Sequence, residues 1–176
     1  MSEADGGLDG RGAVVMTERE LQDWGEALGR AAAAAEVFVA LYGELGAGKS
    51  TLVRAACRAL GVTGSVPSPT FTLVNIHRGT ETEIHHADLY RLEPPVAEKT
   101  LVDAGWPELL EAEGPVFVEW ADRAADWLPP DRWDIELARA PGDPMVRLAE
   151  IRARGMAPEP PPPALHAVDE SRRGGR

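Results

Sequence analysis

Apolar side chains recur along the chain at two different periods, which predict alternating helices and strands. The sequence "TERE" (17–20) has the spacing of a capping box, and apolar residues follow it at helical spacing. They are Leu21, Trp24, Leu28 and Ala31. We therefore expect a helix over about residues 17–34. The next run, "EVFVALYG" (36–43), is almost continuously apolar, as is typical of a strand buried on both faces.

Helical and strand patterns continue to alternate through the rest of the chain. Helices are expected at 50–61, 94–105 and 106–114, and strands at 70–77, 83–90, 115–122, 131–139 and 144–154. Two strand pairs are joined by short polar or turn-forming segments, "RGTET" and "APGD", and read as hairpins. This order predicts an α/β fold, with a central mixed β-sheet flanked by helices.

The ends of the chain differ in composition from its middle. Residues 1–13 are acidic and rich in glycine, and residues 155–176 ("GMAPEPPPPALHAVDESRRGGR") are rich in proline with a basic end. Neither composition builds a hydrophobic core, so we expect both segments to be disordered. The folded domain is then expected at 14–154, a size that suits one domain.

Charge and cysteine content narrow the classes of function. The 176 residues contain 18 Lys and Arg against 29 Asp and Glu, a formal net charge of -11. Such a chain is not expected to bind tRNA tightly by itself or to bind an anionic membrane. The single cysteine excludes an intramolecular disulfide and a Cys-rich zinc site. No signal peptide or membrane-spanning apolar run is recognisable, so we expect a cytoplasmic protein.

The segment "GELGAGKS" (43–50) matches the Walker A pattern G-x-x-x-x-G-K-[ST]. Glycines let the backbone amides of such a loop approach phosphate closely, and the following helix adds the positive end of its dipole. Lys49 would reach the β- and γ-phosphates, and the Ser50 hydroxyl would bind Mg²⁺. A buried strand precedes the motif and a helix follows it, so the sequence predicts a single P-loop NTPase domain.

ATP is favoured over GTP because two features of GTPases are missing. The chain has no Asn-Lys-x-Asp motif, and no Asp-x-x-Gly turn follows its candidate Walker B strand, "VFVEW" (116–120). That strand ends in Glu119, a carboxylate that can hold Mg²⁺ or polarise water. Strand alternation in "EIHHADLY" (83–90) places His86 and Asp88 on one face, where either a structural or a functional role is open to them.

Four segments occur in the chain in a characteristic order and spacing: "LYGELGAGKSTL", "SPTFTLV", "HADLYRL" and "VEWADR". With these segments the chain resembles the TsaE family, over about residues 17–147. Members of that family are the ATPase subunit of the bacterial machinery that makes threonylcarbamoyladenosine at position 37 of tRNA. The resemblance implies ATP and Mg²⁺ as cofactors and two partner proteins of the transfer complex. It implies catalytic roles for Asp88, Glu119 and the switch residue Thr70, and leaves open whether both carboxylates act chemically or through Mg²⁺.

The resemblance also implies a set of nucleotide-binding residues, with Ser50 and Glu119 as the metal ligands. The set is Gly43, Glu44, Leu45, Gly46, Ala47, Gly48, Lys49, Ser50, Thr51, Trp120 and Arg147. This chain has Ser50 where many members have threonine, and Leu21 fills a position near the adenine where members often carry threonine.

The function expected from these features is an ATP-binding and ATP-hydrolysing switch subunit, weakly active alone and dependent on its partners. Two alternatives stay open at this stage. One is a small-molecule kinase, whose lid would use Arg123 and Arg132 around "AADWLPPD". The other is a nucleotide-gated interaction module that hydrolyses little ATP.

Overall fold

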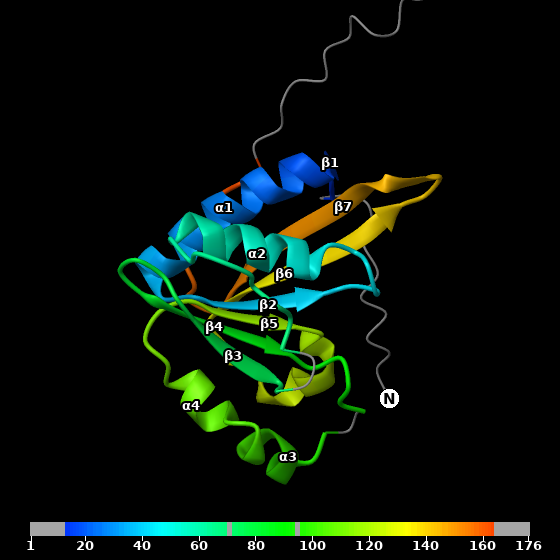
Figure 1. Cartoon of the computed structure of the whole chain (residues 1–176). Coiled ribbons are helices and arrows are strands. Elements are labelled where there is room, and N and C mark those ends of the chain that lie inside the picture. Colours follow the sequence, from blue (N-terminus) through cyan, green and yellow to red (C-terminus); the bar gives the residue numbers. More distant parts are fainter. Residues whose placement is uncertain (1–12, 70–71, 94–95, 164–176) are drawn as a thin grey trace, which may run out of the picture.

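The computed structural model describes residues 13–69, 72–93 and 96–163 (Figure 1). Its strands are β1 Val14–Thr17, β2 Phe38–Tyr42, β3 Val74–Arg78, β4 Glu83–Asp88, β5 Val116–Glu119, β6 Arg132–Ala140 and β7 Asp143–Arg154. Its helices are α1 Glu18–Ala35, α2 Lys49–Ala59, α3 Glu98–Asp103, α4 Trp106–Leu110 and the 3₁₀ helix η1 Ala121–Trp127. The expected α/β fold is confirmed.

The strands form one seven-stranded mixed sheet in the order β1-β7-β6-β2-β5-β4-β3. The central strands β4, β5, β2 and β6 run parallel, whereas β3, β7 and β1 pair antiparallel at the two sides. In this register Glu119 lies opposite both Leu41 of β2 and Asp88 of β4. The carboxyl ends of three parallel strands therefore meet at one edge of the sheet, the edge where α/β proteins bind ligands.

Two hydrophobic clusters cover the two faces of the sheet. On one face, α1 and α2 pack against side chains such as Val39, Phe117 and Ile135. On the other face, η1, α3 and α4 pack against alternate residues of the same strands, such as Ala40 and Val118 (Figure 1). Alternation along the strands thus divides the side chains, because successive residues point to opposite faces.

The structure adds two elements that the apolar pattern did not predict. Strand β1 is a short edge strand that precedes the capping-box helix, and its Thr17 is also the N-cap of α1. Strand β5 ends at Glu119 rather than continuing to residue 122, because Trp120 adopts a left-handed conformation with φ 58° and η1 begins directly afterwards. A left-handed residue cannot continue an extended strand.

The first part of the proline-rich tail differs from the expectation of disorder. Residues 155–163, here called the proline strap, lie against the domain. The indole Nε1 of Trp24 donates a hydrogen bond to the carbonyl of Pro161 at 2.9 Å, and that of Trp133 donates to Pro158 at 2.7 Å. Proline carbonyls accept hydrogen bonds although the residue lacks an N–H, and these two buried indoles need acceptors. The segments expected to be disordered at 1–12 and 164–176 lie outside the described residues.

Among the helices of the described ranges, none combines the length and the apolar character needed to cross a membrane.

Candidate nucleotide-binding site

A cleft of about 360 Å³, here called the nucleotide cleft after its expected ligand, lies at the carboxyl edge of the parallel strands, beside the start of α2. Residues of α1, the glycine loop, α2, β4, β5 and β7 line it. Ten of the residues expected from the sequence are among them: Leu45, Gly46, Gly48, Lys49, Ser50, Thr51, Asp88, Glu119, Trp120 and Arg147. Residues far apart in sequence therefore meet here because the sheet register aligns the strand ends.

The glycine loop is held in a conformation that most side chains would disrupt. Gly48, the N-cap of α2, has φ 114°, and a Cβ atom there would lie 2.6 Å from Cδ2 of Leu21. No side chain caps the helix. The first backbone amides of α2 are thus available to an anion, where they and the helix dipole favour phosphate.

Lys49 is the buried cation of the cleft, with only 4% of its surface exposed. Its Nζ donates hydrogen bonds to the carbonyls of Gly43 at 2.5 Å and Glu44 at 3.0 Å. Among the described residues, no carboxylate forms an ion pair with it within 4.0 Å. Burial lowers the pKa of Lys49, whereas nearby carboxylates, Glu119 first, oppose the shift. An anion bound beside this ammonium would add a direct ion pair, which no carboxylate of the described residues forms.

Ser50 and Glu119 form a hydrogen-bonded pair next to Lys49. The Ser50 hydroxyl donates to Oε2 of Glu119 at 2.8 Å, while Oε1 of Glu119 lies 2.9 Å from Nε2 of His86. Glu119 and His86 are both buried. A hydroxyl and a carboxylate oxygen at this spacing are hard oxygen ligands that suit Mg²⁺.

Among the described residues, no group of three or more His, Cys, Asp and Glu side chains is arranged to hold a metal ion. Mg²⁺ characteristically takes only one or two protein ligands and completes its shell with phosphate and water. The Ser50–Glu119 pair therefore fits a Mg²⁺ ion that arrives with a nucleotide better than it fits a resident metal.

Asp88 ends β4 on the same face of the sheet as His86. Its Oδ2 accepts a hydrogen bond from the Ser68 hydroxyl at 2.5 Å, and its Oδ1 accepts one from the backbone N–H of Tyr90 at 3.0 Å. Asp88 is 5% exposed and lines the cleft. Ser68 thereby ties the segment 67–69 to the cleft; its neighbour Thr70, expected to be the switch residue, lies outside the described residues.

Trp120 forms one wall of the cleft. Nζ of Lys49 lies 3.9 Å from the centroid of its indole ring, a cation–π contact, and the ring of Tyr90 is 5.0 Å away. The left-handed backbone of Trp120 turns the chain at the end of β5. Strain of this kind is characteristic of functional sites, because the surrounding structure must hold it.

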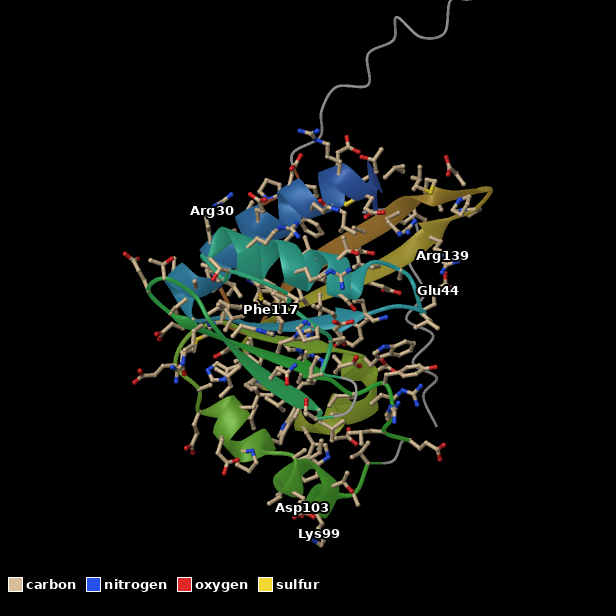
Figure 2. All side chains as sticks on the ribbon, in the orientation of Figure 1. Arg30, Glu44, Lys99, Asp103, Phe117 and Arg139 are labelled. Atoms are coloured by element: carbon tan, nitrogen blue, oxygen red, sulfur yellow. The ribbon has the colours of Figure 1, made fainter. Side chains whose placement is uncertain are left out.

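The start of the glycine loop lies against β6 rather than in the cleft. Nη2 of Arg139 donates to the carbonyl of Leu45 at 3.1 Å, and its Nε is 4.0 Å from Oε1 of Glu44, as Figure 2 shows for the two labelled side chains. Gly43 and Glu44 line a second cleft, and Ala47 is buried in the core. These three predicted residues therefore shape the loop without lining the nucleotide cleft.

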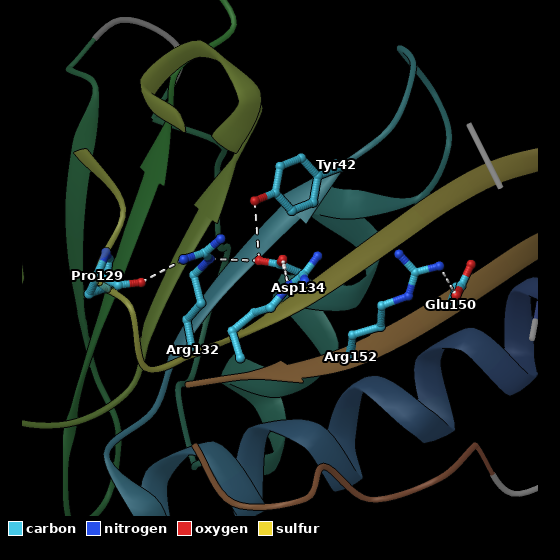
Figure 3. A network of polar contacts seen from close by, with 7 residues as sticks. Tyr42, Pro129, Arg132, Asp134, Glu150 and Arg152 are labelled. Carbon is cyan, nitrogen blue, oxygen red and sulfur yellow. Dashed lines mark hydrogen bonds and ion pairs between the residues drawn. The ribbon is translucent and has the colours of Figure 1, made fainter. Parts of the chain in front are cut away.

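The second cleft, of about 560 Å³, lies on the opposite face of the sheet. Figure 3 shows its polar network: Asp134 accepts hydrogen bonds from Tyr42 at 3.2 Å and Arg132 at 2.7 Å, and Arg152 pairs with Glu150. Nε of Arg154 also donates to Asp134, at 2.6 Å. Burial, followed by the Asp134 charge, raises the pKa of Tyr42 to about 12. We call these residues the Asp134 network.

Sequence reasoning missed three residues that line the nucleotide cleft: Glu18, Arg54 and Tyr90. Arg54 lies one helical turn beyond Ser50, so helical spacing could have indicated it. Tyr90 follows the strand-end Asp88 by two residues. Glu18 carries no such signal, because it reaches the cleft through the packing of α1 and β1 against β7.

Comparisons with known proteins agree on one family. The family model "Threonylcarbamoyl adenosine biosynthesis protein TsaE" matches residues 15–146. The chain is 38% identical to a tRNA threonylcarbamoyladenosine biosynthesis protein TsaE of Synechocystis, over 57% of this chain and 63% of that protein. It is 34% identical to the TsaE of Streptomyces coelicolor, over 68% of this chain and 80% of that protein.

The aligned region spans less than two thirds of the Synechocystis protein and 59% of a similar Nostoc protein. The crystal structure of Bacillus subtilis YdiB shares the fold with a TM-score of 0.59 at 24% identity, covering 81% of this chain and 88% of that one. The family match extends over the glycine loop and the ends of β4 and β5. The chain belongs to the TsaE family, whose proteins take part in the biosynthesis of threonylcarbamoyladenosine in tRNA.

Proposed function

We propose that this chain binds ATP with Mg²⁺ in the nucleotide cleft and hydrolyses it, as the ATPase subunit needed for threonylcarbamoyladenosine formation at position 37 of tRNA. One observation carries the proposal: the buried Lys49 and the start of α2, which no side chain caps, share one cleft with the Ser50–Glu119 pair. A cation without a carboxylate partner, set beside two oxygen ligands, suits a nucleoside triphosphate and its metal.

The proposal gives a role to the main polar groups of the cleft. Lys49 and the amides of the glycine loop bind the phosphate oxygens, and Ser50 and Glu119 would hold the Mg²⁺ ion. Bound there, Mg²⁺ neutralises charge on the phosphates. Asp88 accepts a hydrogen bond from the attacking water and orients it toward the γ-phosphorus. Thr70 is assigned to the same site through the family resemblance. Hydrolysis then releases phosphate and ADP.

The proposed partners are the two proteins that carry out the threonylcarbamoyl transfer. A chain with a net charge of -11 gains little from direct contact with the phosphates of tRNA. We propose that its nucleotide cycle acts on these partners instead, in the cytoplasm.

Phosphate release from γ-labelled ATP, with and without both partner proteins, tests the proposal. We expect slow release by the chain alone and faster release with the partners. Lys49→Ala and Glu119→Ala should each lower the rate about 100-fold. Lys99→Ala is the matched control, because Lys99 is exposed on α3, away from the cleft, and pairs with Asp103. Unchanged turnover in both cleft variants would overturn the proposal.

The same experiment separates the alternatives. Label on a metabolite would indicate a kinase, but neither arginine expected in a kinase lid lines the nucleotide cleft: Arg132 bonds with Asp134 and Pro129, and Arg123 bonds with the carbonyl of Leu92. An absence of phosphate release in a single turnover, even with the partners, would indicate a nucleotide-gated interaction module.

A further inference from the structure

We propose that His86 is a positioning residue for Glu119: by donating its Nε2 hydrogen to one carboxylate oxygen, it keeps the other oxygen directed at Ser50 and the metal position. The proposal rests on the proposed function, because it assigns a partner to a residue of that site. It concerns a side chain that touches neither nucleotide nor metal in our assignment.

The contact between the two residues is short and isolated from water. Oε1 of Glu119 lies 2.9 Å from Nε2 of His86, and the two side chains are 3% and 1% exposed. They come from adjacent parallel strands, β4 and β5, whose register places His86 opposite Phe117, two residues before Glu119. Two rigid central strands therefore set the distance, rather than a loop.

The direction of the hydrogen bond follows from the chemistry of the groups. An ionised carboxylate only accepts hydrogen bonds, so with Glu119 in that form the hydrogen of this bond is on Nε2 of His86. The two oxygens of Glu119 are then distinct: Oε1 is held by His86, and Oε2 accepts from Ser50 at 2.8 Å. Rotation of the carboxylate would break both bonds. Hydrogen bonds of this kind to a ligating carboxylate orient it and are needed for full metal affinity or activity.

The far side of the His86 ring is backed by another histidine. The rings of His77 and His86 lie 5.9 Å apart between centroids, and Nδ1 of His86 has no hydrogen-bond partner in the described part of the chain. Burial, and then the proximity of His86, lower the pKa of His77, so this neighbour is neutral at neutral pH. Among the residues that the structure describes, no group on that side competes with Glu119 for a hydrogen bond to the His86 ring.

The neighbouring residue His85 provides a matched control. It has the same side chain on the same strand, but strand alternation turns it to the other face of the sheet, and it does not line the nucleotide cleft. Replacing His85 removes one histidine from β4, as replacing His86 does, but it leaves the contact between His86 and Glu119 in place.

The test compares His86→Leu, His86→Gln and His85→Leu in the full chain with its partners, after thermal unfolding shows that each is folded. We expect His86→Leu to lower single-turnover ATP hydrolysis about 10- to 100-fold, with nucleotide affinity in the absence of Mg²⁺ unchanged and Mg²⁺ dependence weakened. His86→Gln should recover most of the rate, because its amide nitrogen donates from a similar position. His85→Leu should behave as the wild type.

Two results would overturn the inference: wild-type hydrolysis by a folded His86→Leu chain, or a His86→Gln chain as impaired as His86→Leu. A wild-type chain that does not hydrolyse ATP would instead overturn the proposed function. NMR of ¹⁵N-labelled histidine then judges the inference separately. A hydrogen on Nε2 of His86 that exchanges slowly supports it, and the Nδ1–H tautomer overturns it.

Discussion

The nucleotide cleft and the Asp134 network lie on opposite faces of the sheet, and both are rich in charged side chains. In the Asp134 network the charges satisfy each other: one carboxylate accepts from two arginines and a tyrosine. In the nucleotide cleft, Nζ of Lys49 donates to carbonyls of its own loop and lies over the Trp120 ring, and no carboxylate in the described part of the chain forms an ion pair with it. The comparison teaches that the charges of the Asp134 network compensate one another, whereas a buried charge without an ionic partner among the described residues indicates a ligand.

The two regions also differ in backbone conformation. The Asp134 network lies on regular strands, with its residues on β2, β6 and β7. The nucleotide cleft is bounded by left-handed residues at Gly46, Gly48 and Trp120. The glycine loop and the left-handed backbone of Trp120 thus lie where the proposed ligand would bind, and substitutions in the two regions should separate stability from nucleotide binding.

The largest loss of stability is expected for Asp134→Ala. It leaves Arg132 and Arg154 without their carboxylate in a partly buried cleft, so we expect the free energy of unfolding to fall by about 2–3 kcal/mol. Urea denaturation measures this change, and nucleotide affinity should stay unchanged. Asp103→Ala is the control: its exposed pair with Lys99 is worth less than about 1 kcal/mol. Equal effects of the two substitutions would contradict the comparison.

Gly48→Ala should have the next largest effect and act on both properties. The new Cβ would lie 2.6 Å from Leu21 at φ 114°, and we expect a loss of about 1–3 kcal/mol together with loss of nucleotide binding. Gly142→Ala is the matched control, since Gly142 also has a positive φ, 84°, with no atom within 4 Å of its Cβ position. Isothermal titration with ATP and Mg²⁺ should separate the variants; the comparison fails if Gly142→Ala binds nucleotide as poorly as Gly48→Ala.

Tyr42 gives the Asp134 network a dependence on pH. Its pKa is about 12 in the folded chain, against 10.0 for an unperturbed tyrosine, so the unfolded chain ionises first as the pH rises. The contribution of Tyr42 to the free energy of unfolding is therefore fully present below pH 10 and is lost as the pH approaches 12. Tyr42→Phe should cost about 1 kcal/mol at neutral pH and flatten this alkaline decline. Urea denaturation of the wild type and of Tyr42→Phe between pH 10 and 12 checks this prediction. If the free energy of unfolding falls equally in both proteins, Tyr42 is not the cause of the decline.

Lys49→Met is expected to have the smallest effect on the stability of the chain, although it should abolish nucleotide binding. Burial disfavours the charged form of Lys49, so Lys49→Met should change the free energy of unfolding of the nucleotide-free chain by less than about 1 kcal/mol. In wild type, ATP with Mg²⁺ at 100 times its Kd should add about 2.7 kcal/mol. Thermal unfolding with and without nucleotide should show this gain in the wild type alone. A gain in Lys49→Met would show that the lysine is not needed for binding.

The sequence allowed most of the fold and of the cleft to be predicted, because their signals are local. The Walker A spacing, the apolar strands and the strand-end carboxylates Asp88 and Glu119 were all readable. The contact between His86 and Glu119 was not, since it depends on which strands become neighbours in the sheet. The turn at Trp120 and the proline strap were also missed, because a left-handed tryptophan has no sequence signature and proline content alone suggests disorder.

The proline strap also bears on when the domain can be completed during synthesis. Trp24 and Pro161 are 137 residues apart, so the indole of α1 emerges from the ribosome long before its acceptor exists. At ordinary rates of translation, the delay is about 7 to 30 seconds. Over that interval the helix α1 lacks one of its native contacts, which can form only after the proline strap has been synthesised.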